Sequence, residues 1–256
     1  MTLNIVDRHQ LILKKLEENG YVNVNELSQD FNVSVVTIRK DLKLLEERKL
    51  LFRSHGKAVP ANPYIKEHHV NIKEKIHPQE KNRIAKAAAA SLAPYDSIII
   101  ASGTSVIEFA RHISATTEDL TVLTASLNTA LILSENTNID VMQLGGIVRK
   151  SSSSVIGPTA EKMLSEFTFT KLFLGVDGID LEFGLTTTNS MEASLNKEMI
   201  KAAQKIIVLA DSSKFGRKGF GKICGLDEVD QIITDNNIDK KTKERLTELG
   251  IDVTIV

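Results

Sequence analysis

Seven short apolar segments between residue 97 and residue 256 constrain the fold more than any other feature of the chain. Each is four to six residues long and rich in β-branched side chains, which is typical of buried strands. The expected strands are Ser97–Ala101, Leu120–Thr124, Asp140–Gln143, Lys171–Gly175, Lys205–Ala210, Gln231–Thr234 and Asp252–Val256. Helical patterns separate several of them, at Ser105–His112, Thr129–Ser134, Pro158–Phe167, Met191–Ala203 and Lys240–Leu249, after an earlier helix at 78–92. This alternation predicts an α/β fold with a mainly parallel sheet and helices on its faces.

Polar residues follow five of the expected strands, at the edge where ligands of parallel sheets bind. They combine small residues, hydroxyls, two carboxylates and one lysine. The candidate effector-binding residues are Ser102, Gly103, Thr104, Ser105, Thr124, Ser126, Asn128, Gly145, Gly146, Asp177, Gly178, Asp180 and Lys214. Any one of these segments is a common turn sequence, but their agreement at five strand ends favours a binding site.

The chemistry of these strand ends indicates a phosphorylated ligand. The sequence Gly103-Thr104-Ser105 opens a helix, so it offers backbone amides and hydroxyls to an anion. Lys214 adds a positive charge, and Asp177 or Asp180 can accept hydrogen bonds from sugar hydroxyls. We therefore predict a site for a small phosphorylated sugar or polyol. No metal site or cofactor is expected.

Three of these segments resemble ribose-5-phosphate isomerases, in the same order along the chain. Ser102–Ser105 is similar to a Gly-Thr-Gly-Ser-Thr loop, Asp177–Asp180 to an Asp-Gly-Ala-Asp turn, and Ala210–Lys214 to an Ala-Asp-Ala-Ser-Lys strand end. The resemblance implies a related fold and a sugar-phosphate pocket.

The catalytic part of that resemblance is incomplete. Counted back from Lys214, the glutamate base of those enzymes falls on Asn196, and an amide cannot take up a proton at neutral pH. Their Lys-Gly-Gly-Gly loop is also absent, and GLTTTNS stands in its region. We predict a pocket that binds without turnover. Glu192 and Glu198 lie nearby, so an active isomerase with an added DNA-binding domain stays as the alternative.

Residues 24–59 show a second pattern, two helices around a tight turn followed by a basic ribbon. Asn25 is the expected N-cap of the first helix, Asn32 tolerates the left-handed turn, and Ser34 caps the second helix. The second helix has an apolar stripe formed by Ile38, Leu42 and Leu45. Leu50–Arg53 and Ala58-Val59 then read as two short strands around a turn.

This arrangement predicts a winged helix-turn-helix that binds DNA. The start of the second helix would face base edges, and its basic residues and those of the wing would meet phosphates or guanines. The candidate DNA-binding residues are Ser34, Val35, Val36, Thr37, Arg39, Lys40, Lys43, Arg53, His55 and Lys57. A protein-interaction domain with a solvated basic face is the alternative for this segment.

Charge is concentrated rather than spread over the chain. Seven basic and three acidic residues between Ser34 and Lys57 give a local excess of four, whereas the 256-residue chain has a formal net charge of -1. A protein that coats nucleic acid nonspecifically is usually more basic. A focused patch on a neutral body therefore favours a site-specific binder.

Residues 33–59 also resemble the winged helix-turn-helix of DeoR-family transcriptional regulators. That family's pattern is Val-Ser, two variable residues, Thr-Ile-Arg-Arg-Asp-Leu, and a His-Gly-Gly-Ala wing. The matching residues are Val33, Ser34, Thr37, Ile38, Arg39, Asp41, Leu42, His55, Gly56 and Ala58. Lys40 and Lys57 depart from the pattern: Lys40 loses the bidentate geometry of arginine, and Lys57 replaces a wing glycine. The resemblance extends over nearly the whole chain.

These patterns divide the chain into a DNA-binding domain at 1–59, a linker at 60–76 and an effector-binding domain at 77–256. His68 and His69 fall in the linker and are expected to be linker residues rather than metal ligands. With one cysteine, Cys224, and no apolar signal core at the N-terminus, we expect a cytoplasmic protein. The apolar runs are far shorter than a membrane span, so no membrane partner is expected.

The resemblance implies a DNA-binding transcriptional regulator, most often a repressor, controlled by a phosphorylated sugar. Its partners would be double-stranded operator DNA and the effector. A homo-oligomer is expected because two heads about one helical turn apart bind DNA more selectively than one. Besides the isomerase, a protein-interaction scaffold is a further alternative, but it would need neither basic recognition residues nor polar strand ends.

Overall fold

The computed structural model describes residues 4–19, 21–48, 50–54, 57–60, 68–113 and 119–256. The chain divides into two compact units, Met1–Tyr64 and Ile65–Val256. We call the first the head and the second the body, and each is described by itself. Among the described residues, no helix combines the length and apolarity that spanning a membrane would require.

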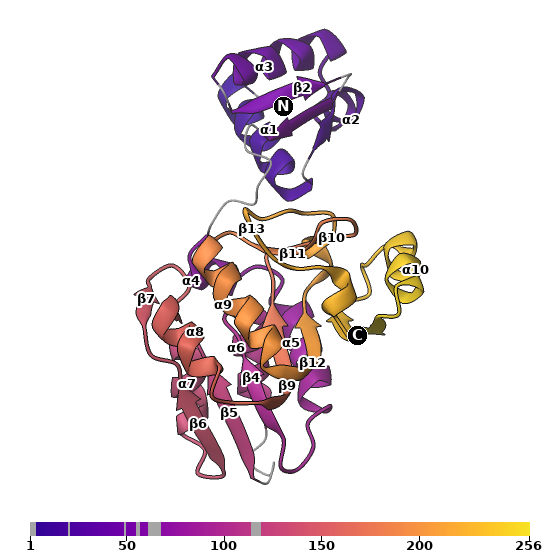
Figure 1. Ribbon diagram of the computed structural model, residues 1–256. Coiled ribbons are helices and arrows are strands. Elements are labelled where there is room, and N and C mark those ends of the chain that lie inside the picture. Colours follow the sequence, from indigo (N-terminus) through magenta and orange to yellow (C-terminus); the bar gives the residue numbers. More distant parts are fainter. Residues whose placement is uncertain (1–3, 20, 49, 55–56, 61–67, 114–118) are drawn as a thin grey trace. The chain divides into compact units, whose positions relative to one another are not determined.

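The head consists of helices packed on a small antiparallel sheet (Figure 1). Its elements are α1 (Ile5–Asn19), β1 (Val22–Asn23), α2 (Val24–Asp30), α3 (Val35–Glu47), β2 (Leu51–Ser54) and β3 (Lys57–Pro60). The strands pair in the order β1-β3-β2. The predicted apolar stripe of α3 is confirmed, since Ile38, Leu42 and Leu45 are all buried. Helix α1 and strand β1 were not predicted, and they complete the core beneath α3 through Ile12 and Val22.

Local capping explains where the two predicted helices of the head begin. Asn32 has a φ of 49°, so the predicted left-handed turn between the helices is confirmed. The Ser34 side chain accepts a hydrogen bond from the Thr37 amide at 3.1 Å, as an N-cap should. The prediction for α2 was wrong by two positions: Asn23 is the cap, and its side chain accepts from the Asn25 amide at 2.8 Å. Asn25 itself lies inside the first turn.

The body is built on a seven-stranded parallel sheet with the order β15-β14-β12-β9-β4-β5-β6. Its strands are β4 (Ser97–Ile100), β5 (Leu120–Thr124), β6 (Ile139–Gln143), β9 (Phe169–Gly175), β12 (Ala203–Leu209), β14 (Gln231–Thr234) and β15 (Asp252–Ile255). All seven predicted strands are present, with ends displaced by two residues at most.

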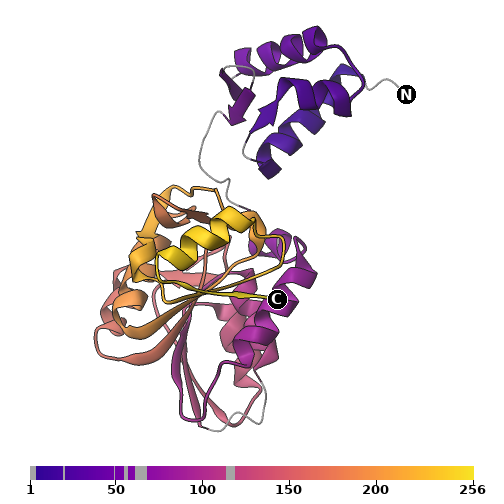
Figure 2. The same cartoon turned by 90° about the vertical axis from the view of Figure 1, so that its right-hand side faces the viewer.

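Helices cover both faces of this sheet (Figures 1 and 2). One face packs against α5 (Pro78–Ala89), α6 (Thr104–His112) and α7 (Leu127–Ser134). The other packs against α8 (Pro158–Leu164), α9 (Ser190–Lys201) and α10 (Lys240–Glu248). Strand β4 shows the alternation that this requires: Ile98 and Ile100 belong to one core and Ile99 to the other.

Several short elements of the body were not predicted from the sequence. A hairpin is formed by β7 (Ile147–Arg149) and β8 (Ser154–Ile156). A second, antiparallel sheet has the order β10-β11-β13, from β10 (Gly178–Asp180), β11 (Gly184–Thr187) and β13 (Gly221–Cys224). Each of these elements follows a strand of the parallel sheet in the sequence. They can therefore shape a site at the carboxyl ends of those strands.

The predicted linker at 60–76 differs from the structure at its C-terminal end. Residues from Ile65 onward belong to the body, and α4 (Val70–Lys73) is a short helix within them. The His69 side chain caps α4 by accepting from the Asn71 amide at 3.4 Å. Val70 is 2% exposed, so this segment packs against the body instead of running free.

Candidate functional site

The outward face of α3 presents the predicted DNA-binding side chains of the head. Val36 is 60% exposed, and Arg39, Lys40 and Lys43 are exposed on the face opposite the buried stripe. Val35 differs, because it packs partly against the head core. An amphipathic helix with its basic face in solvent can enter a major groove without disturbing the core beneath it.

Ser34 and Thr37, at the start of α3, use part of their hydrogen-bonding capacity within the helix itself. The Ser34 hydroxyl accepts a hydrogen bond from the Thr37 amide and also lies 2.9 Å from the Thr37 hydroxyl. Ser34 is exposed and Thr37 half-buried. Both can contact DNA only with the oxygen lone pairs or protons that capping leaves available.

The wing is confirmed as an antiparallel ribbon of β2 and β3, in which Arg53 pairs with Ala58 and Ser54 with Lys57. Arg53 is not isolated, since its guanidinium lies 2.6 Å from Glu46 on α3. The Lys57 ammonium lies 4.8 Å from the centre of the Tyr21 ring, a cation–π arrangement. The predicted contact at His55 lies outside the described residues.

Asp41 has a structural role in the head that the sequence pattern did not reveal. It is 1% exposed on α3 and accepts hydrogen bonds from Arg8 at 2.5 and 3.0 Å, with His9 at 3.1 Å. The hydrogen bond to Asp41 raises the pKa of Arg8. Asp41 therefore ties α1 to the back of the recognition helix and is not part of the DNA-facing surface.

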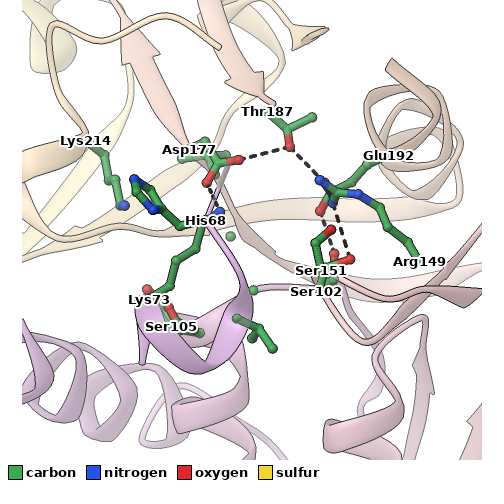
Figure 3. A pocket seen from close by; sticks show the side chains of 16 residues that line it. His68, Lys73, Ser102, Ser105, Arg149, Ser151, Asp177, Thr187, Glu192 and Lys214 are labelled. Atoms are coloured by element: carbon green, nitrogen blue, oxygen red, sulfur yellow. Dashed lines mark hydrogen bonds and ion pairs between the residues drawn. The ribbon is translucent and has the colours of Figure 1, made fainter. Parts of the chain in front are cut away.

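A pocket in the body lies where the carboxyl ends of β4, β9 and β12 meet. These three strands are adjacent in the sheet, so the residues that follow them converge on one edge. The pocket is lined by His68, Val70, Lys73, Ser102, Gly103, Thr104, Ser105, Arg149, Ser151, Ser152, Gly175, Val176, Asp177, Thr187, Glu192 and Lys214 (Figure 3). Six predicted residues are among them: Ser102, Gly103, Thr104, Ser105, Asp177 and Lys214.

The start of α6 gives the pocket an anion-binding character. Gly103 is its N-cap and has a φ of 126°, a conformation that side chains rarely tolerate. The first helical hydrogen bond runs from the Ile107 amide to the Gly103 carbonyl at 3.0 Å. The amides of Thr104 and Ser105 precede that bond, so they have no partner within the helix. Such amides, together with the helix dipole, favour a phosphate.

Charged side chains of both signs line the same pocket. Lys73 lies 2.6 Å from Asp177, and Arg149 lies 2.5 Å from Glu192. Lys214 is half-buried, and within the part of the chain that the structure describes it has no carboxylate at ion-pair distance. Burial raises the pKa of Asp177, but Lys73, with Lys214 and the Thr188 amide, outweighs burial and lowers it to about 2. Asp177 is therefore ionised at neutral pH.

Hydrogen bonds connect the two carboxylates of the pocket. The Thr187 hydroxyl lies 3.2 Å from Asp177 and 2.9 Å from Glu192. The Ser102 hydroxyl donates to Glu192 at 2.7 Å (Figure 3). These contacts bring β11, α9 and the end of β4 together, and they place carboxylate oxygens that can accept hydrogen bonds from ligand hydroxyls.

Five predicted effector-binding residues do not line this pocket, because the β7–β8 hairpin covers the ends of β5 and β6. The Val155 amide donates to the Ala125 carbonyl at 2.8 Å, and the Leu127 amide donates to the Ser153 carbonyl at 3.0 Å. Behind these contacts, Thr124 and Ser126 are fully buried. The five residues that the pocket leaves out here are Thr124, Ser126, Asn128, Gly145 and Gly146.

Thr124 and Ser126 have local partners instead. The Thr124 hydroxyl donates to the Ile100 carbonyl at 2.7 Å, and Ser126 caps α7 by accepting from the Thr129 amide at 3.1 Å. In place of the residues predicted after β5 and β6, the hairpin supplies Arg149, Ser151 and Ser152 to the pocket lining.

Gly178 and Asp180 belong to β10 and also lie outside the pocket lining. Asp180 accepts hydrogen bonds from the amides of Glu182 and Phe183 at 3.1 and 2.7 Å and lies 3.3 Å from Lys218. It organises the turn between β10 and β11. At Gly178 an added Cβ would come within 2.4 Å of the Arg217 carbonyl oxygen, so close packing explains the glycine.

Seven polar residues of the pocket were not predicted as ligand-binding: His68, Lys73, Arg149, Ser151, Ser152, Thr187 and Glu192. The run Thr186-Thr187-Thr188-Asn189 carried a usable signal, because it ends a strand and Asn189 caps α9. Glu192 lies on α9, and the remaining residues come from the hairpin and the segment before α5, whose packing no local pattern indicates.

The positions considered for a catalytic base differ in their surroundings. Asn196 is 3% exposed and does not line the pocket. Glu198 pairs with Lys201 at 2.7 Å, also away from it. Glu192 lies in the pocket, where Arg149, Ser102 and Thr187 surround its carboxylate.

Comparison with known proteins identifies the family of both units. The DeoR-like helix-turn-helix domain matches residues 8–63, and the DeoR C-terminal sensor domain matches residues 76–236. The chain belongs to the DeoR family of transcriptional regulators. It is thus a DNA-binding regulator rather than an enzyme, as the resemblance in the head implied.

Relatives of similar length support this assignment. A protein of Escherichia coli O157:H7 named for the aga operon as a transcriptional repressor is 38% identical over 98% of this chain and 93% of its own. The HTH-type transcriptional regulator GlpR of Haloferax volcanii is 35% identical over 96% of both chains.

Among solved structures, ribose 5-phosphate isomerase A from Neisseria gonorrhoeae matches with a TM-score of 0.39 and 15% identity, over 54% of this chain and 53% of that one.

Proposed function

We propose that this DeoR-family regulator represses an operon of sugar or polyol metabolism and responds to a phosphorylated sugar bound in the body. Named relatives support the first part: besides the aga operon protein, they include the transcriptional repressor GlcR of Bacillus subtilis and a lactose phosphotransferase system repressor of Staphylococcus epidermidis. The protein would act in the cytoplasm, where such metabolites and operator DNA are both present.

The observation that supports this ligand class is that the start of α6 and Lys214 line the same pocket. Amides of Thr104 and Ser105, their buried hydroxyls and the Lys214 ammonium together provide donors and positive charge, and within the described residues Lys214 has no carboxylate at ion-pair distance. A phosphate group satisfies both requirements, because it accepts several hydrogen bonds and carries up to two negative charges. A neutral sugar satisfies only the first.

The carboxylates of the pocket account for the rest of the ligand. Asp177 and Glu192 each have a basic partner, and both line the pocket together with Ser151 and Ser152. Carboxylates and hydroxyls of this kind recognise sugar hydroxyls by hydrogen bonds. The site thus combines an anionic end with a polyhydroxylated end, as a sugar phosphate does.

Binding without turnover agrees best with the surroundings of Glu192. A general base must be able to reach a substrate proton by a hydrogen bond or through one water. Here Glu192 is engaged by Arg149, Ser102 and Thr187 and is 9% exposed as a residue. An isomerisation assay with pentose phosphates tests this part, and measurable turnover that Glu192→Gln removes would contradict it.

The head is proposed to read operator DNA through α3 and the wing, with two heads of a homo-oligomer on successive half-sites. Arg39 and Lys40 project from α3, and Lys57 from the ribbon. Two heads about one helical turn apart add their contact free energies, which gives the selectivity that a single small domain lacks.

A thermal-shift screen of the full chain tests the ligand class. Each phosphorylated sugar is compared with its dephosphorylated form, and we expect stabilisation only by phosphorylated members. Lys214→Met should lose most of that stabilisation, because a charge-assisted contact of this kind contributes about 1.5–3 kcal/mol. Lys86→Met, which changes an exposed lysine on α5, is the matched control. Equal stabilisation by a dephosphorylated sugar would contradict the proposal.

A further inference from the structure

Residues 68–76 come before α5, separated from it by the N-cap residue His77, and form one wall of the pocket. We call them the strap. His68, Val70 and Lys73 of the strap line the pocket together with the start of α6. The head unit ends at Tyr64, so His68 comes only four positions after it. The path of the chain from the DNA-binding unit into the body therefore includes pocket residues.

Three kinds of contact hold the strap on the body. The Val70 amide donates to the Ser151 carbonyl at 2.7 Å, and Lys73 pairs with Asp177 at 2.6 Å. From beneath, the Lys81 ammonium donates to the carbonyl of Lys73 at 2.6 Å and to the carbonyl of Ile76. Two of the three anchor points, Ser151 and Asp177, are themselves lining residues, so the strap and the ligand share one set of partners.

The Lys81 ammonium contacts the strap through two backbone carbonyls. Lys81 is 4% exposed, and burial lowers its pKa to about 8. Its two acceptors are backbone carbonyls, so it positions the strap whatever occupies the pocket. Lys73 differs, because its ammonium points to Asp177 at the end of β9 (Figure 3). Its surroundings change when an anion enters.

We propose that the strap is a sensing element: a phosphorylated effector in the pocket also engages Lys73 and so holds the strap on the body. This inference rests on the proposed function, because it requires an anion at the start of α6. A ligand that contacts the docked strap binds that state more tightly, so it shifts the population toward docking. Occupancy of the pocket then controls the segment that leads to the head.

The consequence for DNA binding is a change in tether length. Release of residues 68–76 adds nine residues of chain between the head and the sheet of the body. Nine extended residues span up to about 30 Å. Half-sites on DNA lie about 34–36 Å apart, so a change of this size alters how two heads can reach them.

Hydrogen exchange of the full chain, read by mass spectrometry with and without inorganic phosphate, tests the inference. We expect millimolar phosphate to slow exchange at least threefold in peptides that cover 102–107 and in peptides that cover 68–76. In Lys73→Met the slowing at 102–107 should remain and the slowing at 68–76 should disappear. Lys75→Met removes an exposed lysine of the same strap and should behave like the wild type.

The outcomes separate the two proposals. Slowing at 102–107 without slowing at 68–76 in the wild type would overturn the strap and leave the anion site intact. Slowing in neither region would contradict both. The comparison is between phosphate and no phosphate in the same variant, so a higher basal exchange in Lys73→Met does not obscure it. Lys81→Met adds a second check: it should raise basal exchange of the strap, and phosphate should still slow it.

Discussion

The head and the body place their functional side chains in opposite ways. In the head, helix α3 carries both the supporting and the functional side chains. Ile38 and Leu42 face the core, and Arg39 and Lys40 face solvent. In the body, the pocket is assembled from segments as far apart as His68 and Lys214, and its two carboxylates are buried and paired with Lys73 and Arg149. A surface that meets DNA can be built locally. A pocket that encloses a small anion needs distant segments to converge.

The largest expected effect is a loss of stability of the head, caused by a change in the buried ion pair behind α3 rather than in its exposed face. Asp41→Asn leaves the buried Arg8 without its carboxylate, and breaking such a pair costs about 3–5 kcal/mol. Calorimetry of the full chain should show the head transition falling sharply. Asp30→Asn is the control, because its pair with Lys15 is exposed and contributes about 1 kcal/mol at most. Equal effects of the two changes would show that Asp41 is not a structural anchor.

The next prediction tests the exposed side of the same helix. Arg39→Ala should weaken operator binding by about 1–3 kcal/mol if Arg39 reads a base, with an unchanged circular dichroism spectrum. Arg39→Lys keeps the charge but loses the bidentate geometry. A base contact predicts that the lysine variant is also impaired, whereas a phosphate contact predicts near-normal binding. Wild-type affinity of Arg39→Ala would remove this residue from the interface.

The pH dependence of the body sharpens the contrast with the exposed head. The pKa of Asp177 is about 2 in the folded chain, below its ordinary value of 3.8. A lowered pKa contributes stability that is present above pH 3.8 and is lost as the pH falls from 3.8 toward 2. The loss is about 2 kcal/mol.

Urea unfolding of the wild type and Asp177→Asn between pH 5 and pH 2 measures this contribution. The advantage of the wild type should shrink by about that amount over the range, because the amide does not titrate. An advantage that stays constant with pH would show that Asp177 is not held ionised by Lys73 and Lys214.

The same contrast explains what could be predicted from the sequence. Segments such as Leu120–Thr124 and Gln231–Thr234 were predicted with correct ends, because apolar β-branched runs report their own burial. The strand-end rule then led to Gly103, Asp177 and Lys214. Each of these lies two to five positions after the last residue of a strand of the parallel sheet.

What was missed depends on packing between distant segments. Arg149 enters the pocket on a hairpin whose strands are three residues long, and Lys73 enters on a four-residue helix within the expected linker. Elements this short have no periodicity to detect. Thr124 and Ser126 were assigned to the site because they follow the strand-end rule. The hairpin that buries them could not be foreseen from their neighbours.

The smallest expected effect concerns the wing. Lys57→Ala should lower affinity for all DNA sequences alike and reduce the salt dependence of binding by about one counterion. The measurement is the slope of log affinity against log salt concentration. Lys240→Ala, whose side chain is 87% exposed on α10, is the control and should leave the slope unchanged. An unchanged slope in Lys57→Ala would place this lysine outside the phosphate contacts.

The central claim is that an anion in the body controls the DNA affinity of the head, and a direct titration tests it. Operator DNA is first selected from a random-sequence pool by the purified chain. Sugar phosphates that stabilise the protein are then added, each beside its dephosphorylated form. The account predicts a 5- to 150-fold change in DNA affinity, about 1–3 kcal/mol of coupling, with the phosphorylated form alone. Lys214→Met should bind DNA like the wild type and show no such change. A normal response of that variant, or an equal response to the dephosphorylated sugar, would contradict the account.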